Sequence, residues 1–237
     1  MIAYDVRHYN SIGSTNDEAQ RLARDGAVHG TVVCAREQTA GRGRHARQWH
    51  SPAGNLYVSI LLRLDMQPSR IAQLSFVAAL AVGDTLDQFL PDGVGTELKW
   101  PNDVLVHRAK IAGILIENMA TATIVGTGLN LRHAPTDAPY PVTSLAAIGR
   151  DSPDARLVLQ VLLDAFARRY GDWMGHGFAA TRTAWLTRAH PTGSPLRVTI
   201  GDRSIEGCFV DLGHDGALII ETADGPKHFV AGEVGLV

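Results

Sequence analysis

The chain has 237 residues, of which 45% are hydrophobic and 19% are charged, so it can bury a substantial core and is not expected to be disordered. The formal net charge of −2 argues against a protein that coats nucleic acid, and Cys34 and Cys208 lack the spacing of a zinc site or a disulfide framework. There is no secretory N-terminal segment and no apolar run of about 20 residues, so a soluble cytoplasmic protein is expected.

The N-terminal stretch predicts a strand followed by a helix. The strand covers residues 4–10, and the helix is expected to end near Asp25. Thr15 and Glu18 have the spacing of a capping box, in which side chains satisfy the free N–H groups of the first turn. Ser14 and Thr15 therefore either cap this helix or present their hydroxyl groups to a polar ligand at its positive end, and position alone favours the cap.

Apolar periodicity and turn residues predict the remaining elements. Strands are expected at 31–35, 55–62, 110–117 and 123–130, with two short strand-like runs around a polar turn in 96–106, and helices are expected at 69–89, 154–170 and 178–189. After a linker-like segment at 190–195, strands at 196–200, 204–211, 217–221 and 228–230 predict a small barrel-like β module. The chain is thus expected to form a large domain over 1–189 and a small one over 190–237.

A basic loop containing two glycines is predicted after the strand at 31–35. Gly41 and Gly43 permit backbone bends that bring N–H groups close to an anion. Arg42 and Arg44 are suited to bind phosphate or carboxylate. These features predict a loop that folds around a small anionic ligand, with a merely solvated basic loop as the alternative.

Two further segments contain charged residues that could contact a ligand. Lys99 and Asp103 flank the polar turn, where they would supply a cation and a carboxylate to a nucleotide phosphate and its magnesium ion. Lys110 begins an apolar strand in which Gly113 allows close approach. A lysine in this position either extends to water or presents its charge to a reacting carboxylate or phosphate.

The strand at 123–130 contains a Gly-x-Gly pattern at Gly126 and Gly128. A dinucleotide-binding motif would require a following helix with a third glycine, and no such helix is predicted. The sequence therefore argues against a Rossmann domain.

Together, these segments resemble the biotin protein ligases, the enzymes that biotinylate carboxyl-carrier domains. The matching residues, in family order, are 14–16, 38–44 with Trp49, 99–103, 110–115 and 126–130. Each motif alone is modest, whereas five in order are specific, and the resemblance covers essentially the whole chain. It implies an α+β fold: a mixed β-sheet catalytic domain with helices on one face, of the class II synthetase-like biotin–lipoate ligase type, and a C-terminal SH3-like β-barrel.

The resemblance also implies roles for individual residues. Biotin is expected to contact Ser14, Thr15, Asn16, Gln38, Gly41, Arg42, Gly43, Arg44, Lys110 and Gly113. ATP or the adenylate is expected to contact Arg42, Arg44, Trp49, Lys99, Asn102, Asp103, Lys110, Gly128 and Asn130. Lys110 and Arg44 are the expected catalytic residues, and the ligand role of Ser14 and Thr15 replaces the helix-cap interpretation. No metal is expected to be fixed by the protein alone, and the Mg²⁺ that accompanies ATP is expected near Asp103.

The implied activity has two steps: biotin is activated with ATP as biotinyl-5′-AMP and transferred to a lysine of a carboxyl carrier protein of an acetyl-CoA, acyl-CoA or pyruvate carboxylase. The sequence departs from the family at His45 and Ala46, where an Arg-Gly pair often follows the glycine-arginine core. The winged-helix DNA-binding domain of some relatives is absent, which predicts a ligase that does not repress transcription. No DNA or membrane partner is expected, and homodimers joined through the sheet occur in the family.

Two alternative functions remain open at this stage. A lipoate-protein ligase or octanoyltransferase shares the catalytic-domain fold and a lysine, but its pocket lacks polar partners for a ureido group, so Gln38 and the basic loop favour biotin. A binding module that uses the basic loop without catalysis would instead show salt-sensitive binding to polynucleotides without ATP dependence.

Overall fold

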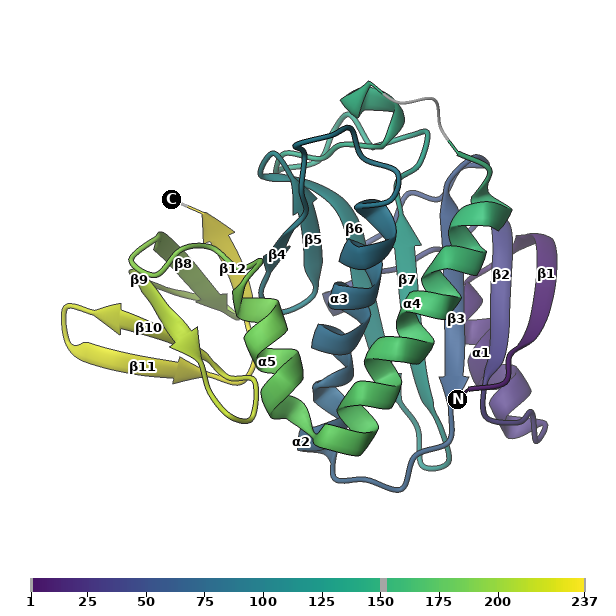
Figure 1. Ribbon diagram of the computed structural model, residues 1–237, viewed down its shortest axis with the longest axis horizontal. Helices are drawn as coiled ribbons and strands as arrows, with labels where there is room; N and C mark the ends of the chain where they lie inside the picture. Colours follow the sequence, from purple (N-terminus) through teal and green to yellow (C-terminus); the bar gives the residue numbers. More distant parts are fainter. Residues whose placement is uncertain (1, 150–152, 237) are drawn as a thin grey trace.

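A seven-stranded mixed sheet forms the centre of the computed structural model, which describes residues 2–149 and 153–236 (Figure 1). Its strands are β1 (Asp5–Ile12), β2 (Thr31–Gln38), β3 (Leu56–Leu62), β4 (Glu97–Lys99), β5 (Asp103–Val106), β6 (Ala109–Asn118) and β7 (Thr123–Leu129). They lie in the order β1-β2-β3-β7-β6-β5-β4. Strands β1 and β2 are parallel, and each of the other neighbouring pairs is antiparallel.

Helices cover both faces of this sheet. They are α1 (Thr15–Arg24), α2 (Pro68–Ala72), α3 (Leu74–Leu86), α4 (Ala155–His176) and α5 (Phe178–Leu186). Helix α3 lies on the sheet between α4 and α5 and is buried on nearly every side, which is why its apolar residues are not confined to one stripe (Figure 1). Helix α1 packs instead on the opposite face, where Ala19 and Leu22 meet Leu61 and Ile124 in a separate small core. The expectation that helices occupy one face is therefore incomplete.

The long helix expected over residues 69–89 is divided in the structure. Helix α2 ends at Ala72 and α3 begins at Leu74, with Gln73 between them. The Gln73 side chain accepts a hydrogen bond from the indole N–H of Trp173 in α4 at 2.9 Å. The break thus lies where a polar side chain is bonded to the neighbouring helix α4.

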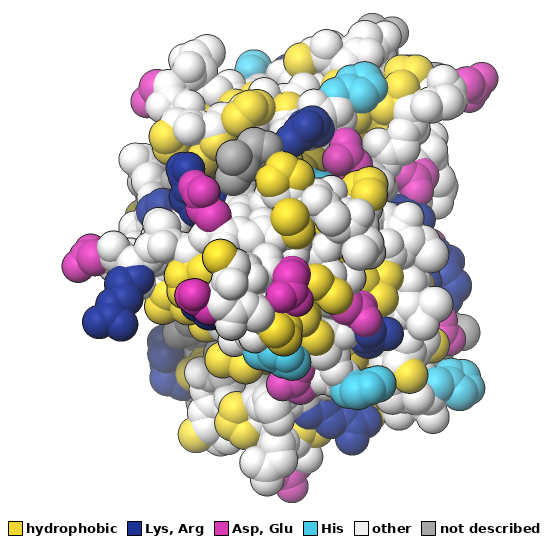
Figure 2. All heavy atoms as spheres, turned by 90° about the vertical axis from the view of Figure 1, so that its left-hand side faces the viewer, with side chains coloured by type: hydrophobic (Ala, Val, Ile, Leu, Met, Phe, Trp, Pro, Cys, Tyr) yellow, Lys and Arg dark blue, Asp and Glu magenta, His cyan; other side chains and the backbone are white. Residues whose placement is uncertain are grey.

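The C-terminal part of the chain forms a second, antiparallel sheet. Its strands are β8 (Pro195–Ile200), β9 (Arg203–Leu212), β10 (Leu218–Thr222), β11 (Gly225–Phe229) and β12 (Glu233–Leu236), in the order β11-β10-β9-β8-β12. The predicted small β module is confirmed, but β12 was not predicted. Figure 2 shows the side of the molecule that this sheet occupies, where acidic, basic, histidine and hydrophobic side chains are interspersed.

The two sheets share one hydrophobic core. Phe76 of α3 packs edge-on against Phe178 and Trp185 of α5, with ring centroids 5.3 and 5.5 Å apart. The Trp100 indole N–H donates to the backbone oxygen of Gly216 across the interface at 3.0 Å. The predicted boundary after residue 189 falls between α5 and β8. Within the described residues, no helix is both long enough and apolar enough to cross a membrane.

Candidate active site

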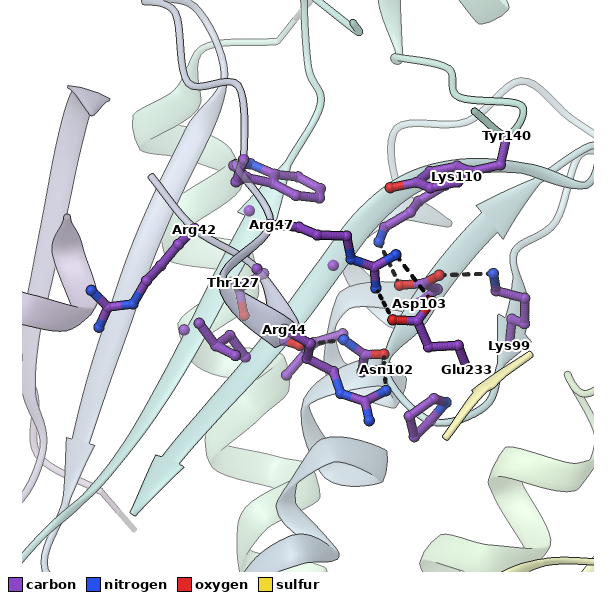
Figure 3. A pocket seen from close by; sticks show the side chains of 18 of the residues that line it. Arg42, Arg44, Arg47, Lys99, Asn102, Asp103, Lys110, Thr127, Tyr140 and Glu233 are labelled. Carbon is purple, nitrogen blue, oxygen red and sulfur yellow. Dashed lines mark hydrogen bonds and ion pairs between the residues drawn. The ribbon is translucent and has the colours of Figure 1, made fainter. Parts of the chain in front are cut away.

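A cavity of about 590 Å³ lies on the face of the large sheet that α1 covers only in part (Figure 3). Side chains alternate between the faces of a strand. Because Leu61 and Ile124 pack beneath α1, Ser59 and Gly126, each two residues away, face the same side. The open part of this face forms the floor of the cavity.

The floor depends on two glycines that leave room for Trp49. Tyr57, Gly128, Gly113 and Asp103 stand side by side on β3, β7, β6 and β5. A Cβ atom at Gly128 would lie 2.4 Å from the Trp49 indole nitrogen, and one at Gly113 would lie 3.0 Å from its ring. The indole therefore lies directly on the sheet backbone. Its N–H is buried and has no hydrogen-bond partner among the described residues, so it is available to a ligand.

One end of the cavity is uncharged and hydrogen-bonded. Gln38 Oε1 accepts from the backbone N–H of Thr15 at 2.8 Å and from the Thr15 hydroxyl at 3.1 Å. The Ser59 hydroxyl lies 2.8 Å from Thr15 Oγ1 and 2.6 Å from Asn16 Oδ1. Asn16 in turn donates to Glu117 at 2.6 Å. These polar groups are held in fixed orientations beside the floor.

The capping-box interpretation of this segment is wrong. Ser14 is the N-cap of α1, but its side chain makes no capping hydrogen bond. The Thr15 hydroxyl is directed to Gln38, and Glu18 bonds Tyr9 and Arg21. Ser14 and Thr15 line the cavity instead, which agrees with the ligand-facing alternative.

The other end of the cavity is charged. Asp103 lies between two lysines, 2.9 Å from Lys99 and 2.6 Å from Lys110 (Figure 3). Burial alone would raise the pKa of Asp103, but the two ammonium groups outweigh it and hold that pKa below its usual value. Both lysines lie beneath the Tyr140 ring, at 5.9 and 5.6 Å from its centroid, and Lys110 is 5.3 Å from the ring of Trp49. This end carries an excess of positive charge before any ligand binds.

The arginines of the basic loop point in different directions. Arg42 points away from the cavity centre and pairs with Asp17 at 2.5 Å and Glu117 at 3.0 Å (Figure 3). Arg44 donates to the backbone oxygen of Gly232 at 2.9 Å, beside Asn102. Burial lowers the pKa of Arg44. The closure of Arg42 over a ligand therefore stays a prediction, since it would require its ion pairs to be exchanged.

Most of the expected site residues meet at the cavity. Those that line it are Ser14, Thr15, Asn16, Gln38, Arg42, Gly43, Arg44, Trp49, Lys99, Asn102, Asp103, Lys110, Gly113 and Gly128. Gly41 and Asn130 do not line it. Gly41 fits against Ser51 and the Trp49 carbonyl, and the buried Asn130 side chain donates to the backbone oxygen of Thr143 at 3.0 Å. Their predicted ligand contacts stay predictions.

Four residues that shape the site were not predicted: Ser59, Glu117, Tyr140 and Glu233. The signal for Ser59 was a single serine in an otherwise hydrophobic strand. Tyr140 was hidden in a proline-rich connection, which the structure fixes at Lys110 through the bond from the Lys110 N–H to the Pro141 oxygen at 2.9 Å. Glu233 belongs to the strand that was not predicted.

A metal site built only from protein ligands does not fit these residues. The described part of the chain holds no group of three or more histidine, cysteine or acidic side chains that could bind an ion. The Asp103 carboxylate is already shared by two ammonium groups. The expected position of Mg²⁺ near Asp103 stays a prediction.

The arrangement suits a ligand with a neutral polar head and an acidic end. The sequence profile of the Biotin/lipoate A/B protein ligase family matches residues 10–132, and that of the Biotin protein ligase C terminal domain matches residues 192–237. The chain therefore belongs to the biotin/lipoate A/B protein ligase family, and it is a ligase.

Individual relatives agree with this assignment. The biotin–[acetyl-CoA-carboxylase] ligase of Paracoccus denitrificans is 40% identical over 93% of this chain and 96% of its own. The bifunctional ligase/repressor BirA of Bacillus subtilis (strain 168) is 34% identical over 97% of this chain and 73% of its own. The structure of the Aquifex aeolicus biotin protein ligase in complex with biotin and ATP superposes with a TM-score of 0.87 and 29% identity over 98% of both chains. The expected fold class is thus confirmed.

Proposed function

We propose that this chain activates biotin with ATP as biotinyl-5′-AMP and transfers the biotinyl group to a lysine of a biotin carboxyl carrier domain. The observation that carries the proposal is the polarity of the cavity: uncharged hydrogen-bonding groups at one end and an excess of cations at the other. Relatives named as biotin–[acetyl-CoA-carboxylase] ligases support this choice of substrate and carrier.

The uncharged end matches the ureido head of biotin. A ureido group has two N–H donors and one carbonyl acceptor, so it needs both kinds of partner in fixed positions. Thr15, Gln38 and Ser59 supply hydroxyl and amide groups whose orientations are set by their mutual hydrogen bonds. Ser14 adds a hydroxyl that makes no capping bond. Leaving a buried polar group without a hydrogen-bond partner costs about 1–3 kcal/mol. The site therefore favours a ligand whose head group can bond these hydroxyl and amide groups.

The charged end serves the first chemical step. A carboxylate oxygen of biotin attacks the α-phosphorus of ATP, the bond to the bridging oxygen breaks, and pyrophosphate leaves. Two anions must approach each other, so fixed positive charge is the main requirement. Lys110 supplies it next to Lys99, and Asp103 keeps both ammonium groups in place until the ligand arrives.

The second step transfers the biotinyl group. The uncharged amine of a carrier lysine attacks the carbonyl carbon of the mixed anhydride, AMP leaves as an anion, and the amine loses a proton as the amide forms. The anhydride is prone to hydrolysis. The loop from Gly41 to Trp49 is therefore proposed to exclude water from the adenylate until the carrier binds.

The proposal is tested by ATP–pyrophosphate exchange on the purified chain with biotin, lipoate and octanoate in parallel. Exchange with biotin alone supports the proposal. Exchange with lipoate would move the chain to the sister branch of its family, and no exchange with any acid would contradict an adenylating enzyme. Binding to polynucleotides without ATP dependence would support the binding-module alternative.

The role of the loop is tested separately by Arg44→Gly. Because Arg44 lines the cavity and is half-buried, its loss should release biotinyl-5′-AMP prematurely while the adenylate still forms. Diffusing adenylate would label bystander proteins in addition to the carrier. Normal retention and carrier-selective labelling by this variant would contradict the assignment. The absence of repressor activity stays a prediction.

A further inference from the structure

The tip of the basic loop contacts the C-terminal sheet through Arg44, His45 and Arg47, and the proposed function assigns a separate role only to Arg44. Arg47 pairs with Glu233 at the start of β12, with nitrogen–oxygen distances of 2.6 and 3.1 Å. His45 Nε2 lies 3.6 Å from the same carboxylate. Arg44, three residues before Arg47, donates to the backbone oxygen of Gly232, the neighbour of Glu233. Three side chains of the loop tip therefore contact residues 232 and 233, where β12 begins.

The strand end belongs to the wall of the cavity. Residues 233–236 and Thr199 of the C-terminal sheet line it together with Lys99 and Asp103 of the large sheet. In Figure 3, Arg47 and Glu233 lie between the loop and the charged pair formed by Asp103 and Lys99. The contact thus spans the cavity at its charged end.

The tip is also held in an unfavourable backbone conformation. His45 and Ala46 have φ values of 54° and 56°, in the left-handed region that non-glycine residues rarely adopt. The loop closes on itself below the tip, because the Gly43 N–H donates to the Arg47 oxygen at 2.7 Å and the Trp49 N–H to the Gly41 oxygen at 2.9 Å. A strained turn persists only where surrounding contacts hold it in place. Here the contacts of Arg44 and Arg47 with residues 232 and 233 lie on either side of the strained pair.

We propose that Glu233 is a positioning residue of the active site: through Arg47 it holds the loop closed against the cavity and offsets the strain at His45 and Ala46. The C-terminal sheet then forms the part of the cavity wall against which the loop closes. The proposal deepens the proposed function, because it assigns the retention of the adenylate to an ion pair between the two sheets.

The first test uses no ligand, so its outcome does not depend on which reaction the chain performs. Trypsin cleaves after arginine, and cleavage after Arg42 and Arg44 by limited proteolysis reports how often the loop opens. Glu233→Gln should accelerate it about two- to fivefold, because an exposed ion pair contributes only a modest stabilisation. The matched control is Glu206→Gln, which removes an exposed ion pair with Arg197 in the same sheet (2.6 Å) away from the loop.

A charge exchange separates positioning from a general loss of structure. The double variant Arg47→Glu with Glu233→Arg rebuilds the pair with reversed charges, so cleavage after Arg42 and Arg44 should return toward the wild-type rate. The unfolding midpoints of all variants should remain equal. Equal cleavage of Glu233→Gln and Glu206→Gln, or failure of the exchange to slow cleavage, would overturn the proposal.

A second test measures the release of biotinyl-5′-AMP. Glu233→Gln should raise the dissociation rate by the same two- to fivefold, because the pair holds the loop closed, whereas Glu206→Gln should leave that rate at the wild-type value. If the wild type forms no adenylate, the proposed function fails, yet the proteolysis result still decides the role of Glu233. Unchanged release together with unchanged proteolysis would overturn that role.

Discussion

The two ends of the cavity are stabilised in different ways. At the uncharged end, Thr15, Gln38 and Ser59 come from α1, β2 and β3 and satisfy one another by hydrogen bonds. At the charged end, Lys99, Asp103 and Lys110 are joined by ion pairs, and the surrounding walls come from a proline-rich connection, the basic loop and the second sheet. The side chains of the first end thus come from the large sheet and α1 alone, whereas the walls of the second end also include residues of the second sheet.

This difference matches the demands of the ligand at each end. A neutral head group gains specificity from dipoles held in fixed positions, and moving them would lose it. A reacting carboxylate and phosphate need cations that are present beforehand but free to exchange their partner. An ammonium group buried without a counter-charge would be strongly destabilising, so an internal carboxylate such as Asp103 holds the cations until an anion replaces it.

The largest effect is expected from Lys110→Ala, which removes the central cation of the charged end. Under the proposed function, biotin-dependent ATP–pyrophosphate exchange should fall by about 10²–10³-fold or more, because one preorganised charge contact contributes this much to the transition state. Binding of the ureido head should be retained, which isothermal titration with biotin would measure.

The matched control for Lys110→Ala is Lys227→Ala, which removes a lysine whose partner is the exposed Asp224 on the second sheet. This variant should keep wild-type exchange. Equal loss in both variants would show that the charged end has no special role, and unchanged exchange in Lys110→Ala would refute the assignment of Lys110.

A smaller effect is expected from Thr15→Val, which breaks the uncharged end. The substitution removes the hydroxyl that bonds Gln38 Oε1 and Ser59, while the Thr15 N–H still bonds Gln38 and Asn16 still bonds Ser59. Biotin binding should weaken by about 2- to 12-fold, because one hydrogen bond contributes about 0.5–1.5 kcal/mol. ATP binding should not change.

Isothermal titration with each ligand separately would check the result for Thr15→Val. Thr183→Val is the control, since its hydroxyl is exposed and bonds only the preceding turn of α5. If Thr15→Val weakened ATP and biotin equally, the two ends would not be independent, contrary to the comparison above.

Much of the charged end could be predicted from sequence because its residues occupy neighbouring register positions. Lys99, Asp103, Gly113 and Gly128 stand on adjacent strands in one row across the sheet. Each lies in a short motif whose turn or glycine is visible locally. Local patterns therefore marked Lys99, Asp103, Lys110 and Gly113 as candidates, whereas the resemblance to the biotin protein ligases was needed to bring them into one site with Trp49 and Gly128.

The walls could not be predicted for a physical reason. Strand β12 has only four residues, one of them Gly235, and its partner β8 is more than thirty residues away in the chain. The contact of Glu233 with the basic loop depends on how two sheets pack, which no local pattern encodes. Tyr140 likewise reaches the lysines only because the Pro141 oxygen accepts a bond from Lys110.

The charged end should also respond to acid. The folded-state pKa of Asp103 lies below its usual value, which is about 3.9 in an unfolded chain, because two lysines outweigh the effect of burial. Its contribution to stability is thus complete above about pH 4 and is lost as the pH falls through the folded-state pKa. Chemical denaturation between about pH 5 and 2 should show this loss, with a slope of at most about 1.4 kcal/mol per pH unit from this one carboxyl.

Asp103→Asn should reduce that slope, because the amide does not titrate. Asp224→Asn is the control, since Asp224 is exposed and its ion pair with Lys227 is screened by solvent. An acid slope that is the same in Asp103→Asn and in the wild type would show that the lysines do not hold the carboxylate ionised.

The smallest effect is expected from Ala46→Gly at the strained loop tip. A left-handed φ costs a non-glycine residue roughly 1–2 kcal/mol, and glycine avoids this cost while gaining freedom in the open loop worth about 0.5–1 kcal/mol. The balance favours the closed loop, so trypsin cleavage after Arg42 and Arg44 should slow by about twofold. Ala40→Gly, at a position without a positive φ in the same loop, should have the opposite effect because it adds freedom without relieving strain. If both substitutions accelerated cleavage equally, the loop tip would not be strained, and the pair between Arg47 and Glu233 would have no strain to offset.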